Sequence, residues 1–587
     1  MAGEPPGLKI ATTQGETLVR TPSLALLTPL LGAEGPPALG PPRPRWTGRS
    51  LAATLQLPGR ATATYRVRVE PLGDALLLQA EYVAQRAHAL YGWRLFPEET
   101  RFNLYELINF RHRAGMRDVY IKLPLAAGAG HTPGGDTYWD QTGTYSDDWN
   151  FAPHPSVLLF RKNLIHLLIG ALDLPAGFGL RCAIRGQRVV RFWHDFGAGI
   201  YRVRAGERVV SPRYLLLVRE FTGGAETLRD DWLWEMAGEY VEALRRQGLI
   251  PAFRRQPKFA WHLQPHYCTW GDQVFLARQS QGPPEAAGAV IRQQQQQDFA
   301  LAHHIASPEA MLNEALVRRA ATVIQREKLP IKIFIIDAGW QRGLGEWVVN
   351  EGRFPDLRGL IDWLHAQGFK VALWWAAVHL DMNRRHWPAA RYLADGGRTL
   401  MTHGIPLIDY SYPLTRKEYL EPTLRRMISA EPGCYNADMI KLDFMADKVQ
   451  RHIPVHDRNW CGEERYFYEL FRYIAVTCRG YKPEFCLFTM CPHPYLAQWQ
   501  ELVLTSELWT SDPWAHWEKM RYIRTFCPGA GISFFSHMFR ENWGEFCDLA
   551  TAEGSSVSQH GVVGHMDPGS GAMTAQDYQL LRQKLGR

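Results

Sequence analysis

The sequence predicts a multidomain α and β protein in which an N-terminal antiparallel β-sandwich (residues 1–225) precedes a (β/α)8 TIM barrel (residues 258–587). Short β-type runs separated by turn signals fill residues 51–225, which is typical of a large antiparallel sandwich. After Pro257, eight apolar runs alternate with amphipathic helices. Continuously apolar runs are typical of parallel strands covered on both faces, and eight in succession predict a closed barrel.

The N-terminal part begins with a Pro- and Gly-rich lead-in over residues 1–50. Turn sequences such as PLGD and IRGQ separate many of the strands that follow. Residues 126–155 interrupt them with a long Gly-, Asp- and Trp-rich loop. Two interpretations stay open, because loops of this length are commonly functional or disordered: a solvent-exposed loop, or one that reaches a neighbouring site. The side chains available for the second are Asp140, Asp147, Asp148 and Trp149.

Residues 226–257 are expected to form a helical linker, because helical periodicity with alternating charges covers 226–248. The eight runs expected to form barrel strands are 259–263, 331–337, 370–376, 438–444, 485–490, 503–508, 531–537 and 555–564. Helices are expected between most of them, for example at 307–328, 357–368, 419–430 and 463–476. The tract Gln293–Gln297 is expected in a polar loop or at a helix start.

Composition excludes several classes of protein. The 587 residues carry a formal charge of only +7, and no block of Lys and Arg stands out, so we expect no nucleic-acid partner. No apolar run reaches the roughly 18 residues of a membrane span, and the N-terminus lacks the pattern of a signal peptide. The nine cysteines form no CxxC pair and no metal-ligand spacing with histidine. We therefore expect reduced thiols in a cytoplasmic protein without a metal site.

The run Met439–Phe444 (MIKLDF) ends a predicted buried strand with a lysine and a carboxylate. Side chains alternate between the two faces of a strand, so Lys441 and Asp443 point the same way. A neighbouring cation keeps a carboxylate ionised, which suits a nucleophile. The other interpretation is a structural ion pair at a strand end.

Carboxylates recur where other predicted strands end, and catalytic residues of such barrels lie at the carboxyl ends of strands. Each one alone is also explained as the N-cap of the next helix, but several on one rim favour a site. Tryptophans accompany these carboxylates. Asp337 and Trp340 follow predicted strand two, and Asp381 follows Trp374 and Trp375 of strand three. Asp443 and Asp447 end strand four, and Glu507, Asp512 and Trp514 end strand six.

Two carboxylates on either side of one bond are the arrangement that hydrolyses glycosides. Asp443 beside Lys441 fits the ionised nucleophile. Asp512, flanked by Trp509 and Trp514, fits the acid/base whose pKa is raised by desolvation. Glu507 is the alternative acid, although it lies earlier in its strand.

Several motifs resemble glycoside hydrolase family 36, which shares clan D with families 27 and 31. They run in order between about residues 260 and 512, with a weaker echo at Tyr267–Trp270, and comprise Phe334–Trp340, Trp347–Asn350 with Phe354–Pro355, Gly368 leading to Leu373–Trp374, Ile440–Asp443 and Trp509–Asp512. The resemblance implies an N-terminal β-sandwich and a retaining α-glycosidase, usually an α-galactosidase.

The resemblance also implies roles for residues. Asp443 matches the family nucleophile and Asp512 its acid/base, while Lys441 and Asp337 match residues that hydrogen-bond sugar hydroxyls. Further substrate-binding side chains are expected from the strand ends and their loops. They are Trp270, Trp340, Trp374, Trp375, Trp509 and His493.

The sequence departs from the family pattern at three places. Ala338 stands where a second acidic residue usually reads hydroxyls of galactose. The glycine-rich loop after strand five is replaced by Thr489–Pro494, which makes His493 the expected contact there. Only 23 residues follow Gly564, so the family's C-terminal β-domain is expected to be absent or vestigial.

The function expected is hydrolysis of terminal α-galactosides through a covalent glycosyl-enzyme. Ala338 leaves open an α-glucoside, an N-acetylated or an anionic sugar. Gly339–Gln341 also resembles the sequence of family members that transfer the sugar to another sugar. A catalytically silent carbohydrate-binding protein is the alternative of a different class. No cofactor is needed for the chemistry, and a homo-oligomer is left open.

Overall fold

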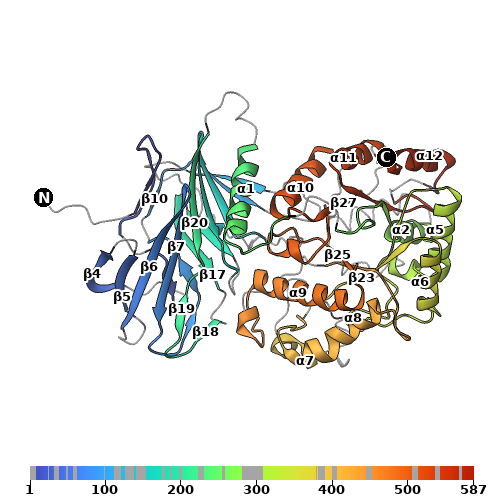
Figure 1. Cartoon of the computed structure of the whole chain (residues 1–587), viewed down its shortest axis with the longest axis horizontal. Coiled ribbons are helices and arrows are strands. Elements are labelled where there is room, and N and C mark those ends of the chain that lie inside the picture. Colours follow the sequence, from blue (N-terminus) through green and yellow to red (C-terminus); the bar gives the residue numbers. More distant parts are fainter. Residues whose placement is uncertain are drawn as a thin grey trace.

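The computed structural model describes most of the chain, in two lobes of different architecture (Figure 1). The described residues are 8–23, 26–31, 39–47, 50–56, 62–97, 100–110, 120–125, 138–139, 154–174, 179–185, 188–196, 201–221, 231–253, 258–280, 308–378, 380, 391–398, 406–444, 453–505, 513–535, 543–566 and 571–586. The loop candidates Asp140, Asp147, Asp148 and Trp149 and the tract Gln293–Gln297 lie outside them.

The N-terminal lobe is built from antiparallel sheets, as the sequence predicts. Its largest sheet has ten strands, in the spatial order β12 (Tyr120–Pro124), β11 (Glu106–Phe110), β14 (Val157–Lys162), β15 (Ile165–Ala171), β20 (Tyr214–Glu220), β7 (Ala75–Val83), β6 (Thr62–Leu72), β5 (Ser50–Gln56) and β4 (Leu39–Thr47), with β19 (Arg208–Val210) paired to β7. A second sheet has the order β13 (Tyr138–Trp139), β16 (Leu180–Arg185), β17 (Arg188–Asp195), β9 (Gly92–Arg94) and β3 (Thr28–Leu30).

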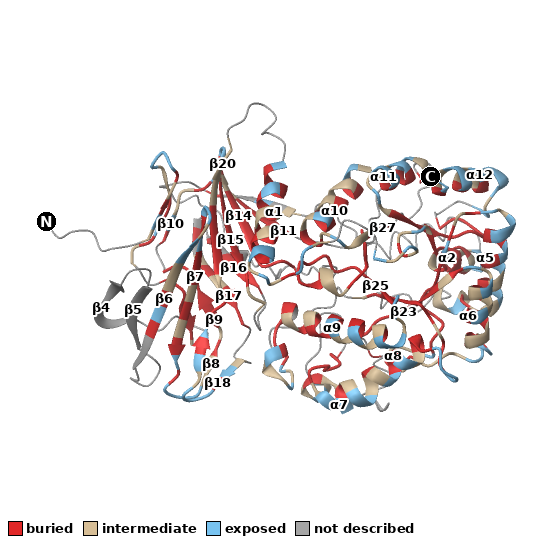
Figure 2. Cartoon of the chain, viewed as in Figure 1, coloured by how far each residue is buried: buried red, intermediate tan, exposed pale blue. Residues whose placement is uncertain are grey.

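Two smaller sheets complete this lobe. They are β1 (Lys9–Ala11), β2 (Thr17–Arg20) and β10 (Arg101–Phe102), and β18 (Tyr201–Val203) with β8 (His88–Leu90). The core between the two main sheets is apolar and includes Phe160 of β14 and Phe192 of β17. Figure 2 shows that the strands next to the helical lobe are buried along most of their length.

The other face of the large sheet is covered by α1 (Asp231–Arg246). Alternation explains the continuously apolar run of β14, because Leu158 faces the sandwich core while Val157 and Leu159 pack with α1. Tyr240 of α1 lies directly on Gly170 of β15, where an added Cβ would come within 2.7 Å of the tyrosine ring. The helix therefore packs closely on the sheet, and its other neighbours include α10 (Pro513–Phe526).

The C-terminal lobe is a closed barrel of eight parallel strands, which confirms the predicted fold class. In order they are β21 (His266–Cys268), β22 (Ile333–Ile336), β23 (Lys370–Trp375), β24 (Met439–Leu442), β25 (Cys486–Thr489), β26 (Leu502–Leu504), β27 (Gly531–Phe535) and β28 (Ser556–His560). Closure is made by β21 and β28, which pair in parallel with His266 opposite Ser558.

Helices lie outside the barrel and turn their apolar sides toward it (Figure 2). Besides α10, they are α2 (Trp270–Gln279), α4 (Pro308–Met311), α5 (Glu314–Arg326), α6 (Leu357–Ala366), α7 (Pro413–Thr415), α8 (Glu421–Ile428), α9 (Glu463–Tyr481), α11 (Trp543–Ala552) and α12 (Ala575–Leu585). Asn313 caps α5 and Asp356 caps α6 through their side-chain oxygens, as short polar residues do at helix starts. Within the part of the chain that the structure describes, no helix combines the length and apolar character needed to cross a membrane.

The predicted first barrel strand at 259–263 is wrong. Those residues form bends and turns, and the first strand is β21. Phe259, Trp261 and Leu263 instead pack against the apolar cluster inside the barrel, which explains why the run is apolar without being a strand.

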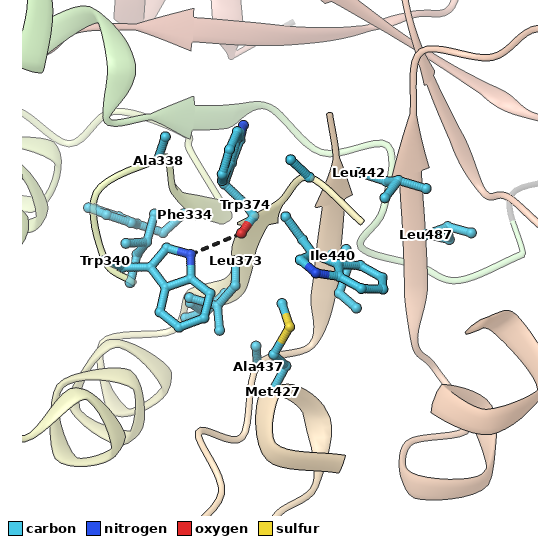
Figure 3. Packing of buried hydrophobic residues seen from close by; sticks show 14 of the residues in the cluster. Phe334, Ala338, Trp340, Leu373, Trp374, Met427, Ala437, Ile440, Leu442 and Leu487 are labelled. Carbon is cyan, nitrogen blue, oxygen red and sulfur yellow. Dashed lines mark hydrogen bonds between the residues drawn. The ribbon is translucent and has the colours of Figure 1, made fainter. Parts of the chain in front are cut away.

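The barrel interior is filled by side chains of one parity from its strands. This interior cluster consists of Cys268, Ile333, Ile335, Ala372, Met439, Cys486, Phe488, Met490, Leu502 and Leu504. The opposite parity contributes to a larger cluster between strands and helices, part of which Figure 3 shows. Parity thus decides which side chains reach the carboxyl end of the interior.

Candidate active site

The candidate site lies at the carboxyl ends of β22, β23 and β24. Asp337 directly follows β22, and Trp374 is the last residue but one of β23. Met439 of β24 faces the barrel interior, and Lys441 and Asp443 follow it at the next two inward-facing positions. Successive inward positions are two residues apart, so this row continues from the interior cluster to the rim. The prediction that Lys441 and Asp443 share a face is confirmed by their contact.

Lys441 connects the two carboxylates. Its Nζ donates to Asp337 Oδ2 at 2.7 Å and lies 3.5 Å from Asp443 Oδ2. Its side chain is buried, and burial alone lowers the pKa of a lysine. The negative charge of Asp337, with smaller contributions from Cys268 and Asp443, outweighs burial and holds the pKa of Lys441 well above its usual value. The site therefore contains a permanent cation between two acidic groups.

Asp443 is held in a fixed orientation by neighbours on two strands. Trp374 Nε1 donates to Asp443 Oδ2 at 2.8 Å, and the Phe444 N–H donates to Oδ1 at 2.7 Å. Phe444 has φ of 53°, a conformation that is rare for a bulky side chain. Its ring packs edge-on against Trp374, with 5.5 Å between centroids. Strained backbone of this kind concentrates at functional sites.

Asp337 receives donors at both carboxylate oxygens. The Cys268 thiol donates to Oδ2 at 3.0 Å, alongside Lys441, and the Ala338 N–H donates to Oδ1 at 2.8 Å. Burial and the charge of Asp337 raise the pKa of Cys268 well above its usual value, so the thiol keeps its proton. Thr269 Oγ1 accepts a hydrogen bond from the Asp337 N–H at 2.9 Å. Asp337 is consequently fixed by the first strand as well as by Lys441.

Cys268 and Thr269 were not predicted as site residues. Their signal was present in the sequence, because Tyr267–Trp270 is the weaker echo of the family pattern and Cys268 has the inward parity of β21. Trp270, which was predicted, starts α2 and is half-buried, packing on both the interior cluster and the outer one. It thus stands at the rim next to these two residues.

Trp340 and Trp375 are not brought into the site, contrary to the prediction. Both side chains are fully buried in the layer between the strands and the helices. Trp375 has the opposite parity to Trp374 and so faces outward. Trp340 donates its indole N–H to the Trp374 carbonyl at 2.9 Å, which braces the end of β23 from outside (Figure 3). Their contribution is to support Trp374.

His493 is also placed differently from the prediction. It is buried after β25, where its Nε2 lies 3.3 Å from Glu464 Oε1 and its ring stacks on Tyr495. Glu464 accepts a second hydrogen bond from Ser156 Oγ of the sandwich at 2.7 Å, and the Tyr495 hydroxyl donates to the Leu172 carbonyl. The described contacts of His493 therefore belong to the junction between sandwich and barrel.

Asp512 and Trp509 lie outside the described residues, as do Glu507, Asp381 and Asp447. The structure does describe Ala338, whose methyl group is buried in the outer apolar cluster. Its carbonyl accepts from Gln273 Nε2 at 2.9 Å. No acidic side chain therefore projects from position 338.

All nine cysteines are described, and each is a buried free thiol. Among the described residues, no group of three or more His, Cys, Asp and Glu side chains is arranged to hold a metal ion. The chemistry that the described site offers is that of two carboxylates, one ammonium group and an indole donor.

Comparison with known proteins relates this barrel to glycoside hydrolases. Residues 293–460 match the TIM-barrel domain of glycosyl hydrolases family 31. No curated protein sequence matches the chain significantly. The matches fit the clan that contains families 31 and 36, without singling out family 36, and they support a glycoside hydrolase.

Solved structures with a similar fold include three bacterial α-galactosidases. The family 36 enzyme of Geobacillus stearothermophilus, in complex with raffinose, has a TM-score of 0.55 at 14% identity over 99% of this chain and 75% of its own. The Lactobacillus brevis enzyme has a TM-score of 0.53 at 13% identity, over 99% and 72%. The Thermus thermophilus enzyme, in complex with stachyose, has a TM-score of 0.50 at 16% identity, over 91% and 99%. At these identities the likeness concerns the fold.

Proposed function

We propose that this protein is a retaining α-glycosidase that hydrolyses terminal α-galactosides, with Asp443 as nucleophile and Asp512 as acid/base. The observation that carries the proposal is the setting of Asp443 at the carboxyl end of β24. Its Oδ2 accepts from Trp374 Nε1 at 2.8 Å and lies 3.5 Å from Lys441 Nζ. The indole donor and the cation hold this carboxylate in one orientation, as a nucleophile aimed at one carbon requires.

In the first step a carboxylate oxygen of Asp443 forms a bond to the anomeric carbon. The bond from that carbon to the leaving oxygen breaks, and Asp512 gives its proton to the leaving oxygen. In the second step Asp512 removes a proton from water, and the water oxygen attacks the anomeric carbon and releases Asp443. Two inversions at one carbon return the sugar with its original configuration.

Lys441 and Asp337 have the chemistry to hold sugar hydroxyls, since one donates and the other accepts. Their contact at 2.7 Å fixes both before substrate arrives. Preorganised polar groups lose little free energy when the substrate binds. The structures of the Geobacillus and Thermus α-galactosidases with raffinose and stachyose make α-galactosides the first substrates to test here.

A second candidate is the same chemistry on another α-glycoside. It is favoured by Ala338, which buries a methyl group where the family pattern has an acidic side chain that accepts hydrogen bonds from sugar hydroxyls. A polar group of the substrate that loses its partner in a buried site costs about 1–3 kcal/mol. The preferred sugar then depends on which other side chain supplies an acceptor.

A panel of aryl α-glycosides separates the two candidates. We expect the α-galactoside to give the highest kcat/KM among α-galactoside, α-glucoside, α-xyloside and N-acetyl-α-galactosaminide. If the α-galactoside is no better than the α-glucoside, the galactosidase assignment fails while the glycosidase assignment stands. Turnover of none of them contradicts both.

Mechanism is tested on the best substrate of that panel. Proton NMR of the first-formed product should show the α-anomer, and an inverted product excludes the two-step route. Azide should partly restore turnover of an activated substrate by Asp512→Ala. If Asp512→Ala loses no activity, the acid/base belongs to another residue, with Glu507 the first to replace.

A further inference from the structure

Cys268 is the last residue of β21 and lies inside the barrel, beside the candidate site. It is paired with Ile335 of β22, and both side chains belong to the interior cluster. Asp337 stands two residues beyond Ile335, at the next inward-facing position. Cys268 is fully buried, and its sulfur lies 3.0 Å from Asp337 Oδ2. This thiol therefore adjoins a carboxylate that the proposed function assigns to substrate binding.

The thiol is the donor in this contact. An ionised carboxylate accepts hydrogen bonds and has no proton to give. Burial and the charge of Asp337 raise the pKa of Cys268 well above its usual value, although the charge of Lys441 acts in the opposite direction. The proton therefore stays on the sulfur and is available to Asp337 Oδ2.

The acceptor positions of Asp337 are nearly all occupied, since each carboxylate oxygen accepts about two hydrogen bonds. Oδ2 receives two, from the Cys268 thiol at 3.0 Å and from Lys441 Nζ at 2.7 Å. Oδ1 receives one, from the Ala338 N–H at 2.8 Å. No other donor to this carboxylate occurs in the part of the chain that the structure describes. One acceptor position thus remains, and it is on Oδ1.

The direction of that remaining acceptor depends on Cys268. The carboxylate plane of an aspartate rotates readily, because its last torsion angle has broad minima. Lys441 resists this rotation weakly, since an ammonium group donates in any of three directions. The Cys268 thiol on one oxygen and the Ala338 N–H on the other fix the plane, and with it the acceptor on Oδ1.

The ends of β21 and β22 hold the two side chains at a constant separation. Thr269, the next residue after Cys268, donates its N–H to the Ile335 carbonyl at 3.1 Å. Its Oγ1 accepts a hydrogen bond from the Asp337 N–H at 2.9 Å. The backbones that carry the thiol and the carboxylate are therefore joined twice next to the contact.

We propose that Cys268 is a positioning residue whose thiol fills the second acceptor position of Asp337 Oδ2, so that Asp337 binds one substrate hydroxyl, at Oδ1. The inference rests on the proposed glycosidase function. Cys268 acts through Asp337 and takes no part in bond cleavage. Loss of the thiol should therefore weaken the recognition of one hydroxyl of the sugar.

The test measures kcat/KM for the best aryl α-glycoside and its monodeoxy forms. In wild type, removal of one particular hydroxyl should lower kcat/KM by roughly 10- to 100-fold, which is the size of a hydrogen bond to a charged group. In Cys268→Ala that penalty should shrink to about threefold or less, while the penalties for the other hydroxyls stay. Cys268→Ser retains a donor and should restore most of the lost penalty.

The path through Asp337 is tested on binding of the free product sugar, measured by calorimetry. Cys268→Ala should weaken its Kd by roughly threefold to tenfold in the otherwise unchanged chain. The same substitution should change Kd by less than about twofold in a chain that already carries Asp337→Ala, because the group that it positions is then missing. A full effect of Cys268→Ala in that second chain would contradict the inference.

A matched control is Cys486→Ala. Cys486 is likewise a fully buried thiol of the interior cluster, but it lies at the amino-terminal end of β25, away from the candidate site. Both alanine variants leave a similar small space, so they should lower the melting temperature by similar amounts, and only Cys268→Ala should change a deoxy penalty. Cys268→Val fills the space without supplying a donor and takes the place of Cys268→Ala if that variant does not fold. Equal loss of kcat/KM for every substrate, or no altered penalty, would show that the thiol is merely structural.

Failure of the proposed function gives a different result. A wild-type chain that binds monosaccharides by calorimetry but cleaves no glycoside contradicts the glycosidase alone, and the deoxy comparison is then made on Kd. A chain that neither binds nor cleaves contradicts both. A chain that cleaves glycosides but keeps every deoxy penalty in Cys268→Ala contradicts the role of Cys268 alone.

Discussion

Asp438 and Asp443 lie at the two opposite ends of the same buried four-residue strand, β24. Asp438 precedes the strand and accepts from His365 Nε2 at 2.7 Å and from the Val371 N–H at 3.0 Å. Asp443 follows the strand and accepts from Trp374 and Phe444. One carboxylate therefore faces the amino-terminal end of the barrel and the other its carboxyl-terminal end.

Substitutions at these two carboxylates should affect stability and activity separately, because catalytic groups of such barrels lie at the carboxyl ends of the strands. Asp438→Asn should lower the free energy of unfolding by about 1–3 kcal/mol, since its partners include Lys370 and Lys482, and leave kcat nearly unchanged. Asp443→Asn should lower kcat by about 10³-fold or more with a small change in stability. Urea unfolding and steady-state kinetics measure both quantities. Full activity in Asp443→Asn would refute the nucleophile assignment.

Lys441 should behave as part of a unit with the two carboxylates that it contacts. Lys441→Met leaves Asp337 and Asp443 buried without their cation, so we expect a loss of about 3–5 kcal/mol in unfolding free energy and loss of turnover. The double variant Lys441→Met with Asp337→Asn should recover part of that stability, because it removes one uncompensated charge. Simple addition of the two single effects would contradict the coupling. Denaturant titrations of the four proteins give the interaction energy.

Strand parity is the property that made part of this site predictable. Lys441 and Asp443 are two residues apart in a short apolar run, so their common face followed from the sequence. The same rule, applied to Trp374 and Trp375, admits only one of the two to the interior, and the contact of Trp374 with Asp443 identifies which. Position at the end of a strand, taken alone, predicts that both bind substrate.

Other features depended on contacts between distant segments. Glu309 reaches the turn at Gly339 through hydrogen bonds of Gln273 and Arg353, and nothing in the local sequence indicates that approach. The apolar run 259–263 has the composition of a strand, but its side chains pack against the apolar cluster inside the barrel. His493 follows a barrel strand, yet its position is decided by the sandwich, through Glu464 and Ser156. Composition and periodicity carry no information on such neighbours.

Substitution of Trp374 and of Trp375 tests whether the first faces the site and the second faces the surrounding helices. Trp374→Phe removes the indole donor to Asp443, so kcat should fall by about 10-fold or more with modest loss of stability. Trp375→Phe leaves a space in the layer between strands and helices, so it should lower stability by about 1–3 kcal/mol and leave KM unchanged. Kinetics and thermal unfolding of the two variants check this. Equal kinetic effects would mean that Trp375 also contacts substrate.

The buried side chain of His266 should make the stability of the protein depend on pH. It is buried in β21, where its ring nitrogens lie 3.0 Å from Ser556 Oγ and 2.8 Å from Ser533 Oγ. Burial lowers the pKa of His266 to about 4, the Gln264 carbonyl acts in the opposite direction, and the charge of Lys441 lowers the pKa further. The folded protein thus keeps this imidazole neutral at pH values where an exposed histidine is protonated.

The difference in the pKa of His266 between the folded and the unfolded chain determines how stability changes with pH. In the unfolded chain the pKa returns to about 6.5, so between pH 6.5 and 4 the unfolded state binds a proton that the folded state does not. Stability should therefore be complete above pH 6.5 and fall as the pH drops toward 4, by about 3 kcal/mol for this group. His266→Gln, which cannot take up the proton, should flatten this part of the curve, measured as melting temperature against pH. His194 of the sandwich, whose pKa burial also lowers to about 4, supplies a similar slope. An unchanged curve in both His266→Gln and His194→Gln would show that neither buried imidazole titrates with unfolding.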